Sequence, residues 1–397
     1  MIKINEILRI NCTGCGACQA KCPVQCITMV PDSEGFLNPS INDSECILCG
    51  KCLKICPFHN NVVKKFPIRV IGAQRLGELV VDSSSGGIGA LIAEKIILNK
   101  GIVYGCILND KFEAVHIRIA DTHKLDMIKG SKYVQSDLSQ IYESLKKDCE
   151  SNRLVAFFGT PCQIAGVKNY LEKEYDNFIC VDLICHGVPS PNLFKKYISY
   201  LEKCKKAESI NTYKFRDKSV YGWNTAYTYT YTCNGKVYSK NGYSTEDPYY
   251  EAFIYAETYR ESCYVCNYAT EERVGDITIG DFWGVLRFYP DLESMASQGI
   301  SAVLINTCKG NQVISELWDN IFAFDSDLKK VEYRNGNLVV PATRPGIRDV
   351  IYKNIDKYGI EWLNNRMRRK KRFYINRLKN GIPVQIKAYI KRKLGRY

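Results

Sequence analysis

The sequence predicts an α/β main domain with a mixed sheet, preceded by a small, cysteine-rich α+β domain. Three observations lead to this prediction. A cysteine run occurs twice within the first 60 residues, short apolar runs alternate with helical patterns through the middle of the chain, and alternating tyrosines at 227–232 predict a β-hairpin. The predicted units are residues 1–62, 68–345 and 346–397, of which the last is a basic helical tail.

At 397 residues the chain is long enough for two or three domains. It contains no run of about 18 apolar residues, so we expect no transmembrane helix. The N-terminal residues lack the pattern of a secretory signal, and we therefore expect a cytoplasmic protein. In a reducing compartment, the 19 cysteines are expected to bind metal or to act in catalysis rather than to form disulfides.

The small domain contains two copies of the run C-x2-C-x2-C-x3-C-P, 34 residues apart. In such a run three thiolates bind one 4Fe–4S cluster and the fourth cysteine binds the other cluster, so the spacing predicts a dicluster ferredoxin domain. Cys12, Cys15, Cys18 and Cys56 are assigned to one cluster, and Cys46, Cys49, Cys52 and Cys22 to the second. A pair of zinc sites is the alternative, but zinc does not require this run twice. Cys26 has no place in the pattern and is predicted to be a packed thiol.

Buried strands and helices alternate in the main domain, which predicts parallel pairing with functional loops at the carboxyl ends of the strands. Predicted strands cover residues 70–74, 102–106, 154–158, 178–184 and 276–281, and predicted helices cover 90–98 and 163–171. Thr160 and Pro161 supply a helix-start signal. Alternating tyrosines at 227–232, followed by Asn234 and Gly235, predict a β-hairpin whose tyrosines pack one face of a sheet.

Four further cysteines of the main domain stand at special places. Cys162 and Cys185 follow predicted strands, and Cys263 and Cys266 form a C-x2-C pair. They are the right number and type of ligands for a third 4Fe–4S cluster. Two inert thiols beside a zinc or redox pair fit the spacing comparably well, so the spacing leaves both interpretations open. The remaining cysteines of this domain are expected to be ordinary packed or surface residues.

Five segments behind the dicluster domain, taken in order, resemble a known family. They are Lys129–Ser136, Gly159–Gln163, Cys185–Pro191, Phe215–Lys218 and Gly280–Gly284. The family is that of the coenzyme F420 hydrogenase/dehydrogenase beta subunits, and the resemblance covers about residues 1–345. It implies an FAD-binding α/β domain with an iron–sulfur cluster near the flavin. The resemblance thereby favours the third cluster on the four cysteines of the main domain.

FAD is implied by the resemblance only, since the chain lacks the strand-GxGxxG-helix fingerprint. The residues that we assign to the flavin are Ser85, Gly86, Gly87, Lys129, Gly130, Ser131, Lys132 and Thr160. Backbone N–H groups of the glycine turn and the positive lysines suit phosphate oxygens; a plain tight turn and solvated lysines are the alternatives. His186 is predicted to donate protons near the flavin, and Asp281 to orient the flavin or a proton path. A structural histidine and a role in a strand-end turn are the alternatives for these two residues.

Together these features predict an iron–sulfur flavoprotein oxidoreductase. It would pass electrons between a low-potential donor, 4Fe–4S clusters, FAD and a substrate or coenzyme. The donor is expected to be a redox partner protein or a ferredoxin-like protein. A non-catalytic electron-transfer subunit of a larger complex of the hydrogenase or dehydrogenase type is the first alternative. A redox-sensing iron–sulfur protein is the second.

The charge of the chain is concentrated in its tail. The 13 lysines and arginines from Arg366 to Arg396 equal the net charge of +13, because the other 42 cations balance 42 acidic residues. We therefore expect no nucleic-acid binding. Apolar residues among the cations of 384–394 predict an amphipathic helix for an anionic surface, at the inner face of the membrane. A solvated terminus is the alternative.

Overall fold

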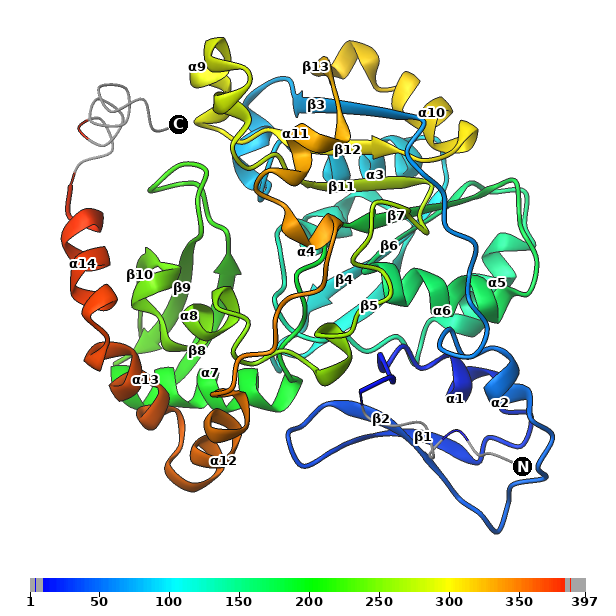
Figure 1. Cartoon of the computed structure of the whole chain (residues 1–397), viewed down its shortest axis with the longest axis horizontal. Helices are drawn as coiled ribbons and strands as arrows, with labels where there is room; N and C mark the ends of the chain where they lie inside the picture. The colour runs from blue at the N-terminus through cyan, green and yellow to red at the C-terminus, as the bar shows by residue number, and fades with distance from the viewer. Residues whose placement is uncertain (1–3, 5–9, 383–385, 387–397) are drawn as a thin grey trace.

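The computed structural model describes residue 4, residues 10–382 and residue 386 (Figure 1). Its centre is an eight-stranded sheet with the strand order β13-β3-β12-β11-β7-β6-β4-β5. The strands are β3 (Arg69–Arg75), β4 (Ile102–Leu108), β5 (Ala114–Ile119), β6 (Val155–Gly159), β7 (Phe178–Leu183), β11 (Ile277–Asp281), β12 (Ser301–Ile305) and β13 (Ile321–Ser326). The sheet contains parallel and antiparallel pairs, so the predicted α/β main domain with a mixed sheet is confirmed.

The directions of the strands decide where functional loops gather. β4, β6, β7 and β11 are parallel, as the alternation of strands and helices predicts. β12 is antiparallel to β11, and β3 is antiparallel to β12, so β3 points in the same direction as the parallel four. β5 and β13 pair antiparallel at the two outer edges. The carboxyl ends of five strands therefore lie along one side of the sheet, which we call the carboxyl edge.

Helices follow several of these strands. They are α3 (Ile88–Leu98), α4 (Leu125–Ile128), α5 (Tyr142–Cys149), α6 (Pro161–Leu171), α9 (Glu293–Ala296), α10 (Cys308–Ser315) and α11 (Leu328–Glu332). α6 begins at the carboxyl end of β6, where Thr160 and Gln163 form a capping box and Pro161 is the first helical residue. The Thr160 N–H donates to Gln163 Oε1 at 3.0 Å. This local signal fixes the start of α6 next to the carboxyl edge.

The dicluster domain lies against α5 and α6, below the sheet in Figure 1. It consists of α1 (Ala17–Lys21), β1 (Ile27–Pro31), β2 (Leu37–Ile41) and α2 (Lys51–Lys54), with β1 and β2 antiparallel. Gly16 and Gly50 precede the two helices at φ +79° and +69°, a conformation that favours glycine. The Tyr142 hydroxyl of α5 donates to the Cys15 carbonyl at 2.7 Å and helps to fix the small domain to this helix.

A second sheet has the order β10-β9-β8 and packs against helices. Its elements are α7 (Pro191–Lys205), β8 (Ser209–Phe215), β9 (Ala226–Cys233), β10 (Lys236–Tyr243) and α8 (Pro248–Ile254). The predicted hairpin is β9 and β10. Tyr213, Tyr227 and Tyr229 are buried, and the ring centroids of Tyr213 and Tyr227 lie 5.9 Å apart. The prediction that the tyrosines pack a sheet face is confirmed.

Three helices complete the described chain: α12 (Arg348–Tyr358), α13 (Ile360–Arg369) and α14 (Lys371–Asn380). α12 belongs to the folded body, because Arg348 is fully buried and its guanidinium donates to Glu34 at 2.7 and 3.0 Å. The stretch 384–394, predicted to be an amphipathic helix, lies outside the described residues except for Ile386. Across residues 10–382, no helix combines the length and the hydropathy that crossing a membrane requires.

Candidate functional site

The eight cysteines of the dicluster domain gather in two groups. One cavity, of about 230 Å³, is lined by Cys12, Cys15, Cys18 and Cys56, which we call the first set. Another cavity is lined by Cys22, Cys46, Cys49 and Cys52, which we call the second set. Each set combines three cysteines of one run with the fourth cysteine of the other run, as two clusters require. Cys26 also lines the second cavity, and its Sγ lies 3.5 Å from that of Cys22.

The donor chemistry of these sets fits iron–sulfur clusters. Burial raises the pKa of Cys15 to about 12 and raises that of Cys18 well above its usual range. Thiolates at such positions are unfavourable unless a cation compensates them, as the iron of a cluster does. The backbone N–H groups of Ala17 and Gln19 act in the opposite direction and lower the pKa of Cys15 and Cys18, as hydrogen bonding to a thiolate does. Hydrogen bonds of this kind tune the reduction potential of a cluster.

The four remaining candidate ligands also come together, and we call them the third set. Cys162 is the second residue of α6, Cys185 follows β7, and Cys263 ends a short 3-10 helix just before Cys266. Burial raises the pKa of Cys162 well above its usual range, and the thiols of the other three raise it further. Thr160, which we assigned to the flavin, borders this set, with Oγ1 at 3.2 Å from Cys162 Sγ. Nowhere in the described part of the chain are three or more His, Cys, Asp or Glu side chains spaced to hold a single metal ion.

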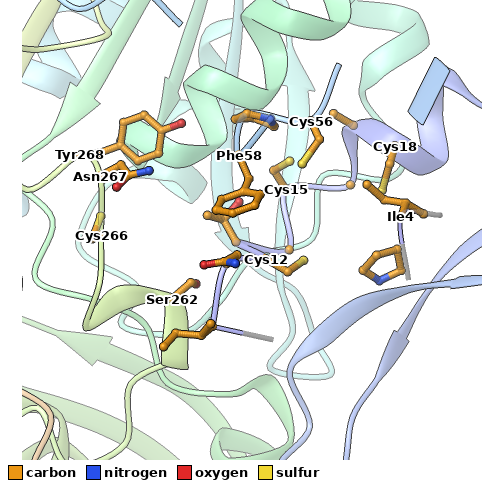
Figure 2. A pocket seen from close by; sticks show the side chains of 18 of the residues that line it. Ile4, Cys12, Cys15, Cys18, Cys56, Phe58, Ser262, Cys266, Asn267 and Tyr268 are labelled. Carbon is orange, nitrogen blue, oxygen red and sulfur yellow. The ribbon is translucent and has the colours of Figure 1, made fainter. Parts of the chain in front are cut away.

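The first set of cysteines lies between the second set and the third set. Cys266 and Tyr268 line the same cavity as the first set, and Figure 2 shows them on one side of it with Cys15 and Cys56 on the other. Burial raises the pKa of Tyr268, and the thiols of Cys162 and Cys15 raise it further, so its ring lies near both sets. The second set adjoins the first, because the thiol of Cys52 contributes to the raised pKa of Cys56. The three sets thus form a series in the order second, first, third.

Ser85, Gly86 and Gly87 lie at the carboxyl edge, in the turn between β3 and α3. The Gly86 N–H donates to Ser301 Oγ at 3.0 Å, so it is not available to a phosphate. A Cβ at Gly86 would collide with a backbone carbonyl of β3, which requires glycine there. Gly87, at φ +80°, forms the N-cap of α3. Close packing therefore explains Gly86, and the backbone N–H groups of this turn that suit an anion are those at the start of α3.

The segment 129–132 lies beside this turn. The Ser131 N–H and hydroxyl lie 2.9 and 3.0 Å from Ser84 Oγ. Lys132 donates to the carbonyls of Met127 in α4 and of Lys129, and burial lowers its pKa to about 8. Lys129 pairs with the carboxylate three residues before it at 2.7 Å. Both lysines bind protein groups, whereas Gly130, at φ +78°, faces open space.

Asp281 is the last residue of β11, and its carboxylate accepts hydrogen bonds from two neighbouring side chains. It accepts from Arg216 Nη1 and Nη2 at 2.5 and 2.8 Å and from the Trp223 indole N–H at 2.6 Å. Burial opposes ionisation, but the Arg216 guanidinium and these hydrogen bonds hold the pKa of Asp281 below its usual range. Asp281 therefore remains an anion at neutral pH and fixes Arg216; it has no proton to donate.

His186 stands at the carboxyl end of β7, directly after Cys185. Burial lowers its pKa, with Asp281 and a hydrogen bond to the Asn337 side chain acting in the opposite direction. The imidazole is therefore neutral at pH 7, and it is close enough to the Arg216–Asp281 pair to respond to both charges. His186 thus lies between the third set and the polar cluster of the carboxyl edge.

From the sequence alone we assigned no role to two buried cations, Arg216 and Lys218, that bind the turn between β3 and α3. Lys218 is 5% exposed and donates to three backbone carbonyls, those of Val80, Ser85 and Gln298, at 2.6 to 2.7 Å. Arg216 donates to the Ser84 carbonyl at 3.0 Å. Both belong to the segment 215–218 that contributes to the family resemblance, so the sequence contained a signal. It could not show that the cations reach the carbonyls of Val80, Ser84, Ser85 and Gln298, because these lie at least 80 residues away in the sequence.

Two family models match parts of this chain. Residues 11–60 match the family model of the 4Fe-4S dicluster domain. Residues 152–330 match the model of the C terminus of the beta subunit of coenzyme F420 hydrogenase/dehydrogenase. The resemblance predicted from the sequence segments is therefore confirmed, and the dicluster match supports 4Fe–4S clusters in the N-terminal domain.

One curated relative and one solved structure illustrate the similarity. The F subunit of the F(420)H(2) dehydrogenase of Methanosarcina mazei is 23% identical over 198 residues, which are 46% of this chain and 56% of that protein. The chain thus spans about half the length of this relative. A chain of the F420-reducing NiFe hydrogenase complex from Methanosarcina barkeri aligns over 79% of this chain and 95% of its own, with 15% identity and a TM-score of 0.42.

Proposed function

We propose that this chain, which contains a 4Fe–4S dicluster domain, is an iron–sulfur flavoprotein oxidoreductase. The observation that supports the proposal best is the series of three cysteine sets, which ends beside His186 at the carboxyl edge. The first and second sets would hold two 4Fe–4S clusters, the third set would hold another, and the carboxyl edge would hold FAD. Iron–sulfur clusters supply one-electron transfer, and a flavin couples it to two-electron chemistry.

The turn before α3 has features that suit the phosphates of FAD. Ser83 is 8% exposed, and its hydroxyl is buried without a hydrogen-bond partner among the described residues. This oxygen lies 3.4 Å from the position that a Cβ would take on Gly87, at the start of α3. The first N–H groups of a helix have no partner within the helix, so they and the Ser83 hydroxyl would bind phosphate oxygens. Arg216 and Lys218 would keep the turn in place by holding its carbonyls.

Lys218→Met is expected to lower the flavin content of the purified protein about tenfold. The substitution leaves three buried carbonyls without their donor, each at a cost of about 1–3 kcal/mol, so the turn would move. Flavin per chain would be measured by absorbance after anaerobic reconstitution with excess FAD. Lys214→Met, at an exposed position on β8 four residues before Lys218, is the matched control. Wild-type flavin content in a folded Lys218→Met protein would show that Lys218 does not position the cofactor.

An electron-transfer subunit without a substrate of its own is the second candidate function. The curated relative is named as a subunit of a dehydrogenase. In this chain, exposed apolar side chains surround the second set: Val24, Ile47 and Leu48 are 39%, 62% and 50% exposed, and Cys49 is exposed. Such a rim suits a redox partner protein. Turnover that appears only when a copurifying partner is added would favour this function, and turnover by the isolated chain would favour the flavoenzyme.

Cofactor analysis of the anaerobically purified protein tests the proposal directly. Iron, sulfide and flavin would be quantified per chain. Three clusters predict about 12 iron atoms, accompanied by one FAD. About 8 iron atoms without flavin would mean that the protein holds only the two clusters of the dicluster domain, and this result would refute the flavoprotein proposal.

A further inference from the structure

One face of α14 is fixed to the body of the protein. Phe373 is 8% exposed, Arg372 Nε donates to Glu251 at 3.1 Å, and the Asn380 amide donates to Glu246 at 2.8 Å. Residues 372, 373 and 380 lie on one side of a helix with 3.6 residues per turn. The rotation of α14 about its axis is therefore set by contacts within the protein.

The opposite face of α14 is apolar and faces solvent. Tyr374, Ile375 and Leu378 are 58%, 50% and 77% exposed. Their spacing of i, i+1 and i+4 places them on one arc of the helix, away from Phe373. Figure 1 shows α14 at the periphery of the molecule, far from the eight-stranded sheet and from the dicluster domain. Within the described chain, this arc is a continuous apolar strip on a helix that carries no acidic residue.

Cations accompany this arc. Lys371, Arg377 and Lys379 are exposed, and no carboxylate of the described residues forms an ion pair with them. The neighbouring cations Arg366, Lys370 and Arg372 differ, because the buried Glu251 and Glu257 pair with them. The sequence after α14 adds five more cations and no acidic residue. The arc is thus apolar at its centre and positively charged around it.

We propose that α14 docks this protein on an anionic lipid bilayer, with the helix lying in the plane of the interface. Tyr374, Ile375 and Leu378 would enter the boundary between headgroups and acyl chains, and Lys371, Arg377 and Lys379 would contact lipid phosphates. An acidic protein surface would satisfy the cations but not three largely exposed apolar side chains, so the bilayer fits both features. This docking does not depend on the cofactors at the carboxyl edge.

Flotation of the full-length protein with vesicles tests the proposal. Vesicles of phosphatidylglycerol and phosphatidylcholine in equal parts would be compared with vesicles of phosphatidylcholine alone. Two α14 variants would be compared with the wild type: Tyr374→Ser/Ile375→Ser/Leu378→Ser and Lys371→Gln/Arg377→Gln/Lys379→Gln. The matched control is Val63→Ser/Val237→Ser/Tyr358→Ser, at positions that are 75%, 68% and 52% exposed elsewhere on the molecule. Iron content and the thermal unfolding midpoint would verify that each variant is folded.

Preferential binding of the wild type to anionic vesicles is expected. The apolar variant should bind at least about tenfold more weakly, because binding scales with the apolar area that enters the interface. The cation variant should also bind more weakly, and the control should bind like the wild type. Equal binding of wild type and apolar variant would overturn the proposal. So would equal binding to both vesicle types, or binding to an acidic protein without binding to vesicles.

Discussion

Cys185→Ser is expected to lower the iron content of the anaerobically purified protein from about 12 to about 8 atoms per chain. The thiolate of Cys185 would be one of four ligands of the third cluster, and a serine hydroxyl is a much poorer ligand for iron. Burial raises the pKa of Cys185 to about 12, so this thiolate is stable only when a cation compensates it. The first and second sets keep all their cysteines, so their iron should remain.

Iron and sulfide analysis, together with the electron paramagnetic resonance spectrum of the reduced protein, would measure this loss. Cys106→Ser is the matched control, because Cys106 is a partly buried cysteine of the same domain outside the three sets. Cys52→Ser should remove iron from the second set instead. An unchanged iron content in Cys185→Ser would exclude the third set as a cluster site and would restore the alternative of inert thiols beside a redox or zinc pair.

Arg216→Met is expected to lower the free energy of unfolding by about 3–5 kcal/mol. The side chains of Arg216 and Asp281 are 2% and 16% exposed, so the substitution leaves a largely buried carboxylate without its cation. Asp281→Asn should cost less, because a neutral amide keeps a hydrogen-bond acceptor for Trp223. Both variants should also lose flavin, since Arg216 holds the Ser84 carbonyl at the carboxyl edge.

Denaturant unfolding under anaerobic conditions would measure these changes. Arg69→Met is the control: Arg69 pairs with Asp325 at 2.8 Å, but their side chains are 40% and 75% exposed, and surface pairs contribute about 0–1 kcal/mol. The double variant Arg216→Met/Asp281→Asn should lose less stability than the sum of the two single losses, because the two residues act as one pair. Additive losses would show that the pair is not an energetic unit.

The sequence alone determined those features that depend on neighbouring residues. The two runs of Cys12–Cys22 and Cys46–Cys56 indicate a dicluster domain, because a short loop must bring its thiolates to one cluster. Thr160 and Pro161 mark the start of α6, since a helix end must satisfy its free N–H groups locally. The hairpin at Asn234 and Gly235 follows from the same kind of short-range geometry.

Only the tertiary structure decided which distant segments meet. Cys162 and Cys266 are 104 positions apart in the sequence. They come together because β6 pairs with β7, and the Arg260 N–H donates to the Val188 carbonyl in the loop after β7. The sequence placed Asp281 at a strand end but could not show that Arg216 occupies its carboxylate. The sequence likewise shows that the tail is rich in cations. It could not show that Arg372 forms an ion pair with the buried Glu251, a contact that leaves the apolar side of α14 facing solvent. Local patterns depend on the geometry of adjacent residues. Strand pairing and burial instead bring together residues that are far apart in the chain, and these contacts determine the charge state and the role of each site residue.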